Sequence, residues 1–223
     1  GAEVRGAVPV NDARVTYVVW VGNGGALIND DPALLGSFRF NNFEDVDNNK
    51  HVGTRIGVVP IPGVEVGASL LKGSVSGAKT SSRDVGTTVW GVDFTLNQEV
   101  KPIGGRVRVD AELIKSNVET VTFLKKGIGP MRFNNDRSGG YAQLAYRPTL
   151  ADSTVVSNTE AVFRYDWQSF PIGAPMNMDL GRATFGLDYW VSPATVLKIA
   201  VDRLFVQGGQ NVMSFYFQIA LGV

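Results

Sequence analysis

The chain has 223 residues, with 21 Lys and Arg side chains against 21 Asp and Glu, so its net charge is zero. A protein whose main partner is nucleic acid or an anionic membrane surface needs an excess of basic residues, which this neutral chain lacks. No apolar run approaches the roughly 18 residues of a transmembrane helix. The lack of cysteine excludes thiolate metal sites and disulfides, and the single histidine, His51, leaves little for a catalytic triad.

Alternation of apolar and polar residues dominates the chain and predicts β-strands, and the 26 glycines agree with many turns. In chain order, the pattern predicts strands that begin near Glu3, Ala13, Lys50, Val64, Val85, Gly105, Gly139, Thr159, Arg182, Thr195 and Asn211.

The apolar members of these strands fall on one side, and the last strand shows this best. If the sheet faces lipid, the residues expected to meet it include Phe163, Tyr165, Phe185, Leu187, Tyr189, Leu197, Ile199, Phe215, Phe217, Ile219 and Leu221.

Two architectures contain such strands, a soluble β-sandwich and a membrane β-barrel. Sandwich strands run to about 5–6 residues, whereas strands that cross a bilayer need about 9–11. Most of the predicted strands are of the longer kind, such as the one over 105–116. Length therefore favours the barrel.

Connector length points the same way. Short or intermediate links, such as Pro60–Gly63 and Ser192–Thr195, alternate with longer polar connectors over 22–49, 72–84, 117–138 and 169–181, apart from a modest last loop near 207–210. Outer-membrane barrels have short periplasmic turns and longer extracellular loops, whereas a sandwich has no reason to sort its connectors in this way. The predicted fold is all-β, an antiparallel up-and-down transmembrane β-barrel with residues 1–223 in one domain.

The count of about eleven strands is odd, whereas bacterial single-chain barrels have an even number. We therefore expect at least one further strand before Gly1, and this chain to be the C-terminal part of a larger barrel.

Three stretches, Phe40–Gly57, Ser138–Pro148 and Gly186–Pro193, resemble a family of bacterial outer-membrane porins related to the phosphate- and polyphosphate-selective porins. The last strand is similar to the outer-membrane assembly signal, although it ends in Val223 rather than in an aromatic residue. The resemblance implies a trimeric or monomeric diffusion channel of about 16 to 18 strands in a Gram-negative outer membrane. It also implies that the constriction loop lies in the N-terminal half, outside this chain.

The polar side of the predicted strands would line the pore. The residues expected there are Arg14, Arg55, Arg106, Arg108, Asp110, Glu112, Arg147, Arg164, Asp166, Arg182, Asp188, Lys198 and Asp202, together with Glu65, Asp93 and Glu160. Such charges either set a mild anion preference, since arginine grips phosphate and carboxylate, or pair across strands and keep the lumen wet.

The sequence thus predicts an outer-membrane porin for passive diffusion of small hydrophilic or anionic solutes, with outer-membrane lipids and further copies or an envelope complex as partners. It predicts no enzyme activity, no cofactor, no metal site and no nucleic acid. One alternative is a barrel that surrounds another component of an envelope complex. The other is a soluble ligand-binding β-sandwich. An enzyme barrel of the phospholipase type would depend on His51 alone.

Minor motifs add little to this prediction. Asp45–Asn49 is rich in side chains with oxygen atoms, as calcium-binding loops are, but it lacks the EF-hand glycine and glutamate. We therefore expect a solvated loop. His51 is expected to begin a strand. Tyr146 and Tyr189 near the short turns, with Trp167 near a long connector, are expected to form aromatic girdles at the membrane surfaces.

Overall fold

The computed structural model describes residues 1–29, 31, 34–39, 49–75, 85–125, 129–175 and 177–222. One large sheet contains eleven strands: β1 (Ala2–Val10), β2 (Ala13–Asn23), β5 (Lys50–Ile61), β6 (Val64–Val75), β7 (Val85–Val100), β8 (Gly105–Val118), β11 (Arg137–Arg147), β12 (Thr159–Ser169), β13 (Leu180–Ser192), β14 (Thr195–Val206) and β15 (Val212–Leu221).

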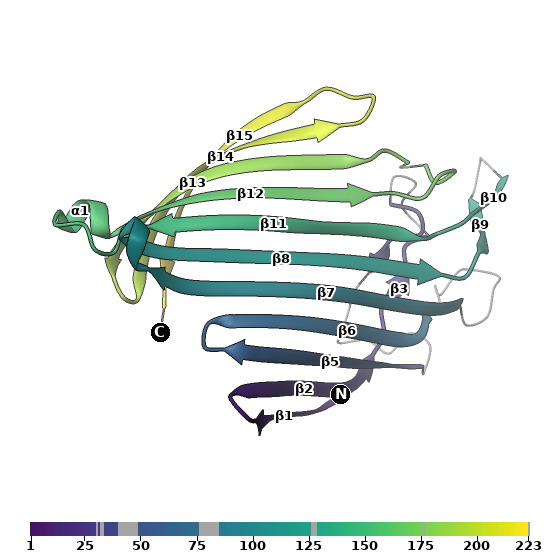
Figure 1. Cartoon of the computed structure of the whole chain (residues 1–223). Coiled ribbons are helices and arrows are strands. Elements are labelled where there is room, and N and C mark those ends of the chain that lie inside the picture. The colour runs from purple at the N-terminus through teal and green to yellow at the C-terminus, as the bar shows by residue number, and fades with distance from the viewer. Residues whose placement is uncertain are drawn as a thin grey trace.

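Each of these strands pairs antiparallel with the next along the chain, in the order β1-β2-β5-β6-β7-β8-β11-β12-β13-β14-β15 (Figure 1). The predicted all-β, up-and-down antiparallel class is confirmed. The sandwich alternative is wrong, because the strands form a single sheet rather than two large sheets packed face to face.

Strand starts were predicted to within two residues, because regular alternation marks both faces of a long strand. The short strands β3 (Ala26–Leu27), β4 (Phe38–Arg39), β9 (Val121–Lys125) and β10 (Gly129–Phe133) were not predicted. They form two small hairpin sheets, β3 with β4 and β9 with β10, inside connectors that were expected to be polar loops.

Short links gather at one end of the sheet. Asn11 takes a left-handed conformation (φ 53°) in the β1–β2 turn, and Gly63 does so (φ 81°) in the β5–β6 turn, as tight hairpins require. The 3-10 helix η1 (Lys101–Ile103) and the α1 loop (α1, Thr154–Ser157) connect strands at the same end. We call this the short-turn end, and the opposite one the long-connector end (Figure 1).

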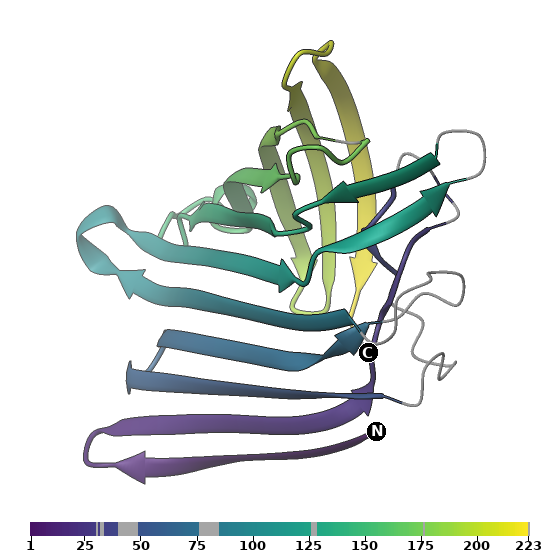
Figure 2. The ribbon, with the colours of Figure 1, turned by 90° about the vertical axis from the view of Figure 1, so that its right-hand side faces the viewer.

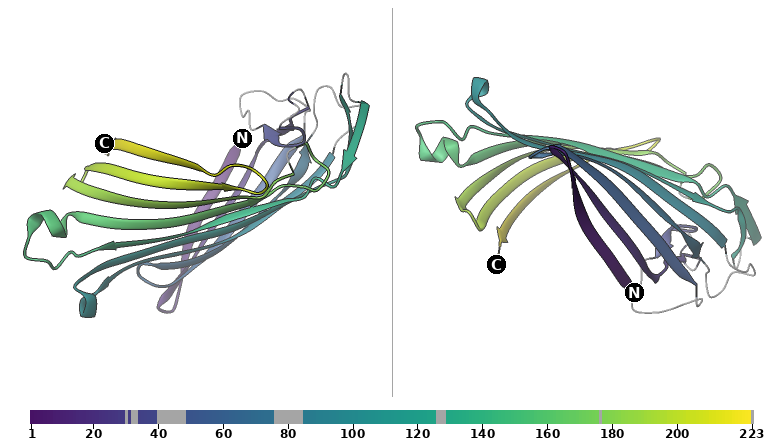
Figure 3. Two further views of the ribbon diagram at one scale, coloured as in Figure 1. Left: turned by 90° about the horizontal axis from the view of Figure 1, so that it is seen from above. Right: turned by 60° about the horizontal axis from the view of Figure 1, so that its bottom comes forward.

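The sheet twists and curls, so that its first and last strands run in different directions (Figures 2 and 3). β1 and β15 are its two edges. In the part of the chain that the structure describes, no helix is long and apolar enough to cross a membrane.

Candidate functional site: the charged face of the sheet

Register divides the sheet into two chemically different faces. The charged face carries all the residues predicted to line a pore: Arg14, Arg55, Arg106, Arg108, Asp110, Glu112, Arg147, Arg164, Asp166, Arg182, Asp188, Lys198 and Asp202. Pairs such as Glu160 with Asp188, and Asp188 with Lys198, lie directly opposite each other across neighbouring strands.

The apolar face carries the residues predicted to meet lipid: Phe163, Tyr165, Phe185, Leu187, Tyr189, Leu197, Ile199, Phe215, Phe217, Ile219 and Leu221. Most of them are well exposed, with Phe215 at 79% and Phe217 at 68%, whereas Tyr189 and Leu197 are half-buried against each other in register. Further exposed side chains, among them Val4, Val19, Ile56 and Leu144, extend this surface across the sheet.

Charges of opposite sign meet across the charged face. Within the eleven strands it holds ten basic residues (Arg5, Arg14, Arg55, Arg106, Arg108, Arg137, Arg147, Arg164, Arg182, Lys198) and ten acidic ones (Glu3, Glu65, Asp93, Glu99, Asp110, Glu112, Glu160, Asp166, Asp188, Asp202). Ion pairs join Arg164 to Asp166 at 2.7 Å and Lys198 to Asp188 at 3.2 Å. Many of the charges predicted to line a pore are therefore neutralised locally, as expected if they pair across strands.

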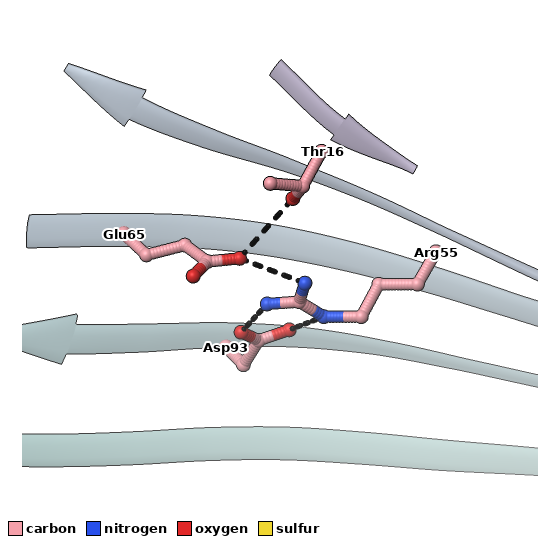
Figure 4. A network of polar contacts seen from close by, with 4 residues as sticks. All are labelled: Thr16, Arg55, Glu65 and Asp93. Atoms are coloured by element: carbon pink, nitrogen blue, oxygen red, sulfur yellow. Dashed lines mark hydrogen bonds and ion pairs between the residues drawn. The ribbon is translucent and has the colours of Figure 1, made fainter. Parts of the chain in front are cut away.

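The densest network surrounds Arg55 on β5 (Figure 4). Its guanidinium donates to both oxygens of Asp93, at 3.1 and 2.5 Å, and to Glu65 Oε1 at 2.8 Å. Thr16 donates to the same oxygen of Glu65 at 3.4 Å. The network lies over Gly57 and Gly67, where any Cβ would overlap the charged groups, so these glycines let the guanidinium lie close to the sheet.

A second cluster, the arginine corner, lies at the short-turn end and consists of Arg106, Arg108 and Arg147. Arg106 and Arg147 are direct cross-strand partners, an arrangement of like charges that costs free energy by itself. Arg108 pairs with the buried carboxylate of Glu160 at 2.8 Å, whereas Arg106 reaches Glu99 only at 3.5 Å.

Arg147 contacts no carboxylate among the described residues. It donates to the Ser157 carbonyl at 2.8 Å and to Asn158 Oδ1 at 2.9 Å, and its guanidinium lies 5.5 Å from the centre of the Trp190 ring. The arginine corner thus gathers three arginines, of which Arg147 has no carboxylate partner among the described residues.

At the long-connector end, the connectors fold onto the charged face. A buried apolar cluster joins Leu27 and Leu35 from one connector with Phe123 and Phe133 from another, against the strand-end residues Val75, Val85 and Val118. The two phenylalanine rings stack at 5.2 Å.

Polar contacts tie the same connectors to β11. Asn135 donates to the Gly36 carbonyl at 2.7 Å, and Arg137 donates to the Leu35 carbonyl at 3.3 Å. The resemblance placed a constriction loop outside this chain, yet the connector after β2 covers part of the charged face here. Its signal in the sequence was apolar pairs such as Ala26-Leu27 and Leu34-Leu35 inside a polar loop.

His51 lies in β5 as expected and is 2% exposed. One of its ring nitrogens, Nε2, lies 2.8 Å from the Ser74 carbonyl oxygen, and its ring occupies the space beside Gly24 and Gly73. The histidine therefore fills a gap between strands and a connector.

Aromatic residues predicted to mark the membrane surfaces lie on the apolar face near strand ends. Tyr146 donates to the Ile103 carbonyl at 2.6 Å at the short-turn end, and Tyr165 stacks on Trp167 at 6.4 Å toward the other end. Most of the oxygen-rich stretch 45–49, the first part of the porin-like stretch 40–57 and Val223 lie outside the described residues.

Similarity to known proteins is found among solved structures and not among family models or curated proteins. The sequence matches no protein-family model and no curated protein. Among solved structures, the chain is similar to the beta domain of the Bordetella autotransporter BrkA, at 13% identity and a TM-score of 0.44, over 99% of this chain and 88% of that one.

Proposed function

We propose that this chain forms part of the wall of a bacterial outer-membrane β-barrel channel, through which small hydrophilic solutes diffuse passively. In this proposal the apolar face meets lipid and the charged face lines an aqueous lumen. The long-connector end lies outside the cell, and the short-turn end faces the periplasm.

The observation that carries the proposal is the uncovered apolar face. Exposed large apolar side chains follow one another across all eleven strands, and no other element that the structure describes covers them. Soluble monomers rarely expose an apolar patch above a few hundred Å². Strands of 9 to 16 residues are also long enough to cross a bilayer, which takes about 9–11.

Closure of the barrel requires more than this sheet. β1 and β15 both run from the long-connector end to the short-turn end, so direct pairing between them would be parallel. Antiparallel closure needs an odd number of additional strands, and we propose that the same protein supplies them. A closed ring leaves no edge in the hydrocarbon.

The charge pattern supports a weakly selective channel. Basic and acidic residues balance on the charged face, and ion pairs neutralise many of them, so rings of one sign are absent from the described strands. In the arginine corner, where Arg147 has no carboxylate partner among the described residues, the adjacent arginines favour anions locally. Arg106 is its most accessible member, with 53% of its side chain exposed.

The test is ion conduction by the full-length protein in planar lipid bilayers. We expect steady unit conductances and a small reversal potential toward anions in a salt gradient. Arg106→Gln is expected to move that potential toward cations, because it removes the most accessible positive charge of the arginine corner. Lys101→Gln, a matched loss of charge in the η1 turn off the charged face, is the control.

Membrane insertion without conductance would overturn the channel and favour a barrel filled by another component. Equal reversal potentials for the wild type, Arg106→Gln and Lys101→Gln would overturn the selective role of the arginine corner.

A further inference from the structure

The few charged residues on the apolar face are all basic. Every Asp and Glu of the eleven strands lies on the charged face, whereas Lys50, Lys72, Lys115 and Arg203 lie on the apolar face. The net charge of zero therefore does not reveal that the acidic residues of these strands all lie on one face.

These four residues, which we call the cation belt, all lie near strand ends at the same end of the sheet. Lys72, Lys115 and Arg203 each precede the last residue of their strand by three positions, in β6, β8 and β14, and Lys50 begins β5. All four strand ends belong to the long-connector end (Figure 1). The apolar face bears no basic residue at the short-turn end of the eleven strands.

The belt side chains are exposed and, among the described residues, Lys72, Lys115 and Arg203 form no ion pair. Lys50 donates to Asn23 Oδ1 at 2.9 Å, and the Arg203 guanidinium lies 5.3 Å from the centre of the Phe205 ring. Trp90, a residue type typical of the membrane interface, is the direct cross-strand partner of Lys115.

A charged side chain near the edge of a lipid-facing wall extends toward the headgroups, because its charge stays hydrated there. The positive side chains of the belt then lie next to the charges of the lipid headgroups. Ammonium and guanidinium groups both bind phosphate, and clusters of them are attracted to anionic lipid surfaces.

We propose that the cation belt binds phosphate groups of anionic lipid headgroups in the leaflet at the long-connector end. This inference rests on the proposed function, since it needs the apolar face to meet lipid. The belt then also sets the orientation of the barrel, because the short-turn end has no matching cations.

The test compares lipids retained by the full-length protein in native mass spectrometry. The probes are a diphosphorylated glycolipid and the zwitterionic phosphatidylcholine, offered together in detergent. We expect the wild type to prefer the phosphorylated lipid by at least about tenfold. The triple variant Lys72→Gln, Lys115→Gln and Arg203→Gln is expected to lose most of that preference.

A matched triple variant, Arg5→Gln, Arg14→Gln and Arg106→Gln, removes the same charge from exposed positions of the charged face and is expected to keep the preference. If the triple variant fails to fold, Lys115→Gln alone tests the belt at one exposed site, and we expect it to lose part of the lipid preference.

Equal retention of both lipids by a wild-type protein that still conducts ions would contradict lipid binding by the cation belt. It would not contradict the proposed channel. The same loss in both triple variants would also contradict lipid binding by the belt, because net charge and not the belt would then be responsible. Failure of the wild type to insert into bilayers would overturn the proposed function, and the inference with it.

Discussion

At the scale of single residues, the charged face is organised by pairs that are distant in sequence. Arg55 and Asp93 are 38 positions apart and meet only because β5, β6 and β7 are neighbours in register. Their contact also depends on Gly57 and Gly67, which leave room above the sheet for the guanidinium. Alternation in the sequence predicted the face of each residue but not its partner.

Arg55→Gln is expected to make the lumen more cation-preferring, because Glu65 and Asp93 then share the charged face without the cation between them. The reversal potential of the variant in a salt gradient measures this. We also expect a loss of roughly 1 kcal/mol in unfolding free energy, since the groups are about one-third exposed and solvent screens the pair.

Gly67→Ala is the matched control, since it disturbs the packing of the same network and keeps every charge. It is expected to lower the stability and to leave the reversal potential near that of the wild type. An unchanged potential in Arg55→Gln would show that this network does not influence ion passage.

At the scale of elements, each long strand separates two environments, so neighbouring residues should respond in opposite ways to a charge. Ile199 and Ala200 are adjacent in β14, and register places Ile199 on the apolar face and Ala200 on the charged face.

Ile199→Arg is expected to lower the free energy of unfolding from lipid vesicles by about 2–4 kcal/mol, because it places a charge in the hydrocarbon near the middle of the strand. Ala200→Arg is expected to cost much less, since its side chain reaches the aqueous face beside Asp188 and Asp202. Urea titration of the vesicle-bound protein measures both. Similar losses for the two variants would contradict the assignment of the faces.

The connectors behave differently from the strands. The polar composition of 117–138 predicted a loop, yet β9 and β10 form a hairpin there, and Phe123 and Phe133 join the buried cluster. Short stretches such as Val121–Phe123 do not reveal the partners of their apolar residues, because the residues that bury them come from another connector and from strand ends. The sequence therefore did not predict the contact between the two connectors.

At the scale of the whole molecule, we expect heat-dependent migration on gels in dodecyl sulfate. A closed barrel keeps all its strands hydrogen-bonded and resists the detergent until it is heated. An antibody against β15 should detect a band in outer-membrane fractions that shifts on boiling, with a denatured mass above that of 223 residues. A non-shifting band in the soluble fraction would contradict the barrel.

Alternation and turn residues were enough to predict about eleven main strands and their starts, the faces of the residues named for the lumen and for lipid, and the sorting of most connectors between the two ends. These properties are local, since alternate residues of a strand point to opposite faces and turn residues such as Gly, Asn and Pro favour tight turns. The pairing of the charges, the meeting of three arginines at the arginine corner and the packing of the connectors over one end became visible only in the folded chain. These features depend on register and on contacts between distant segments, which alternation does not encode.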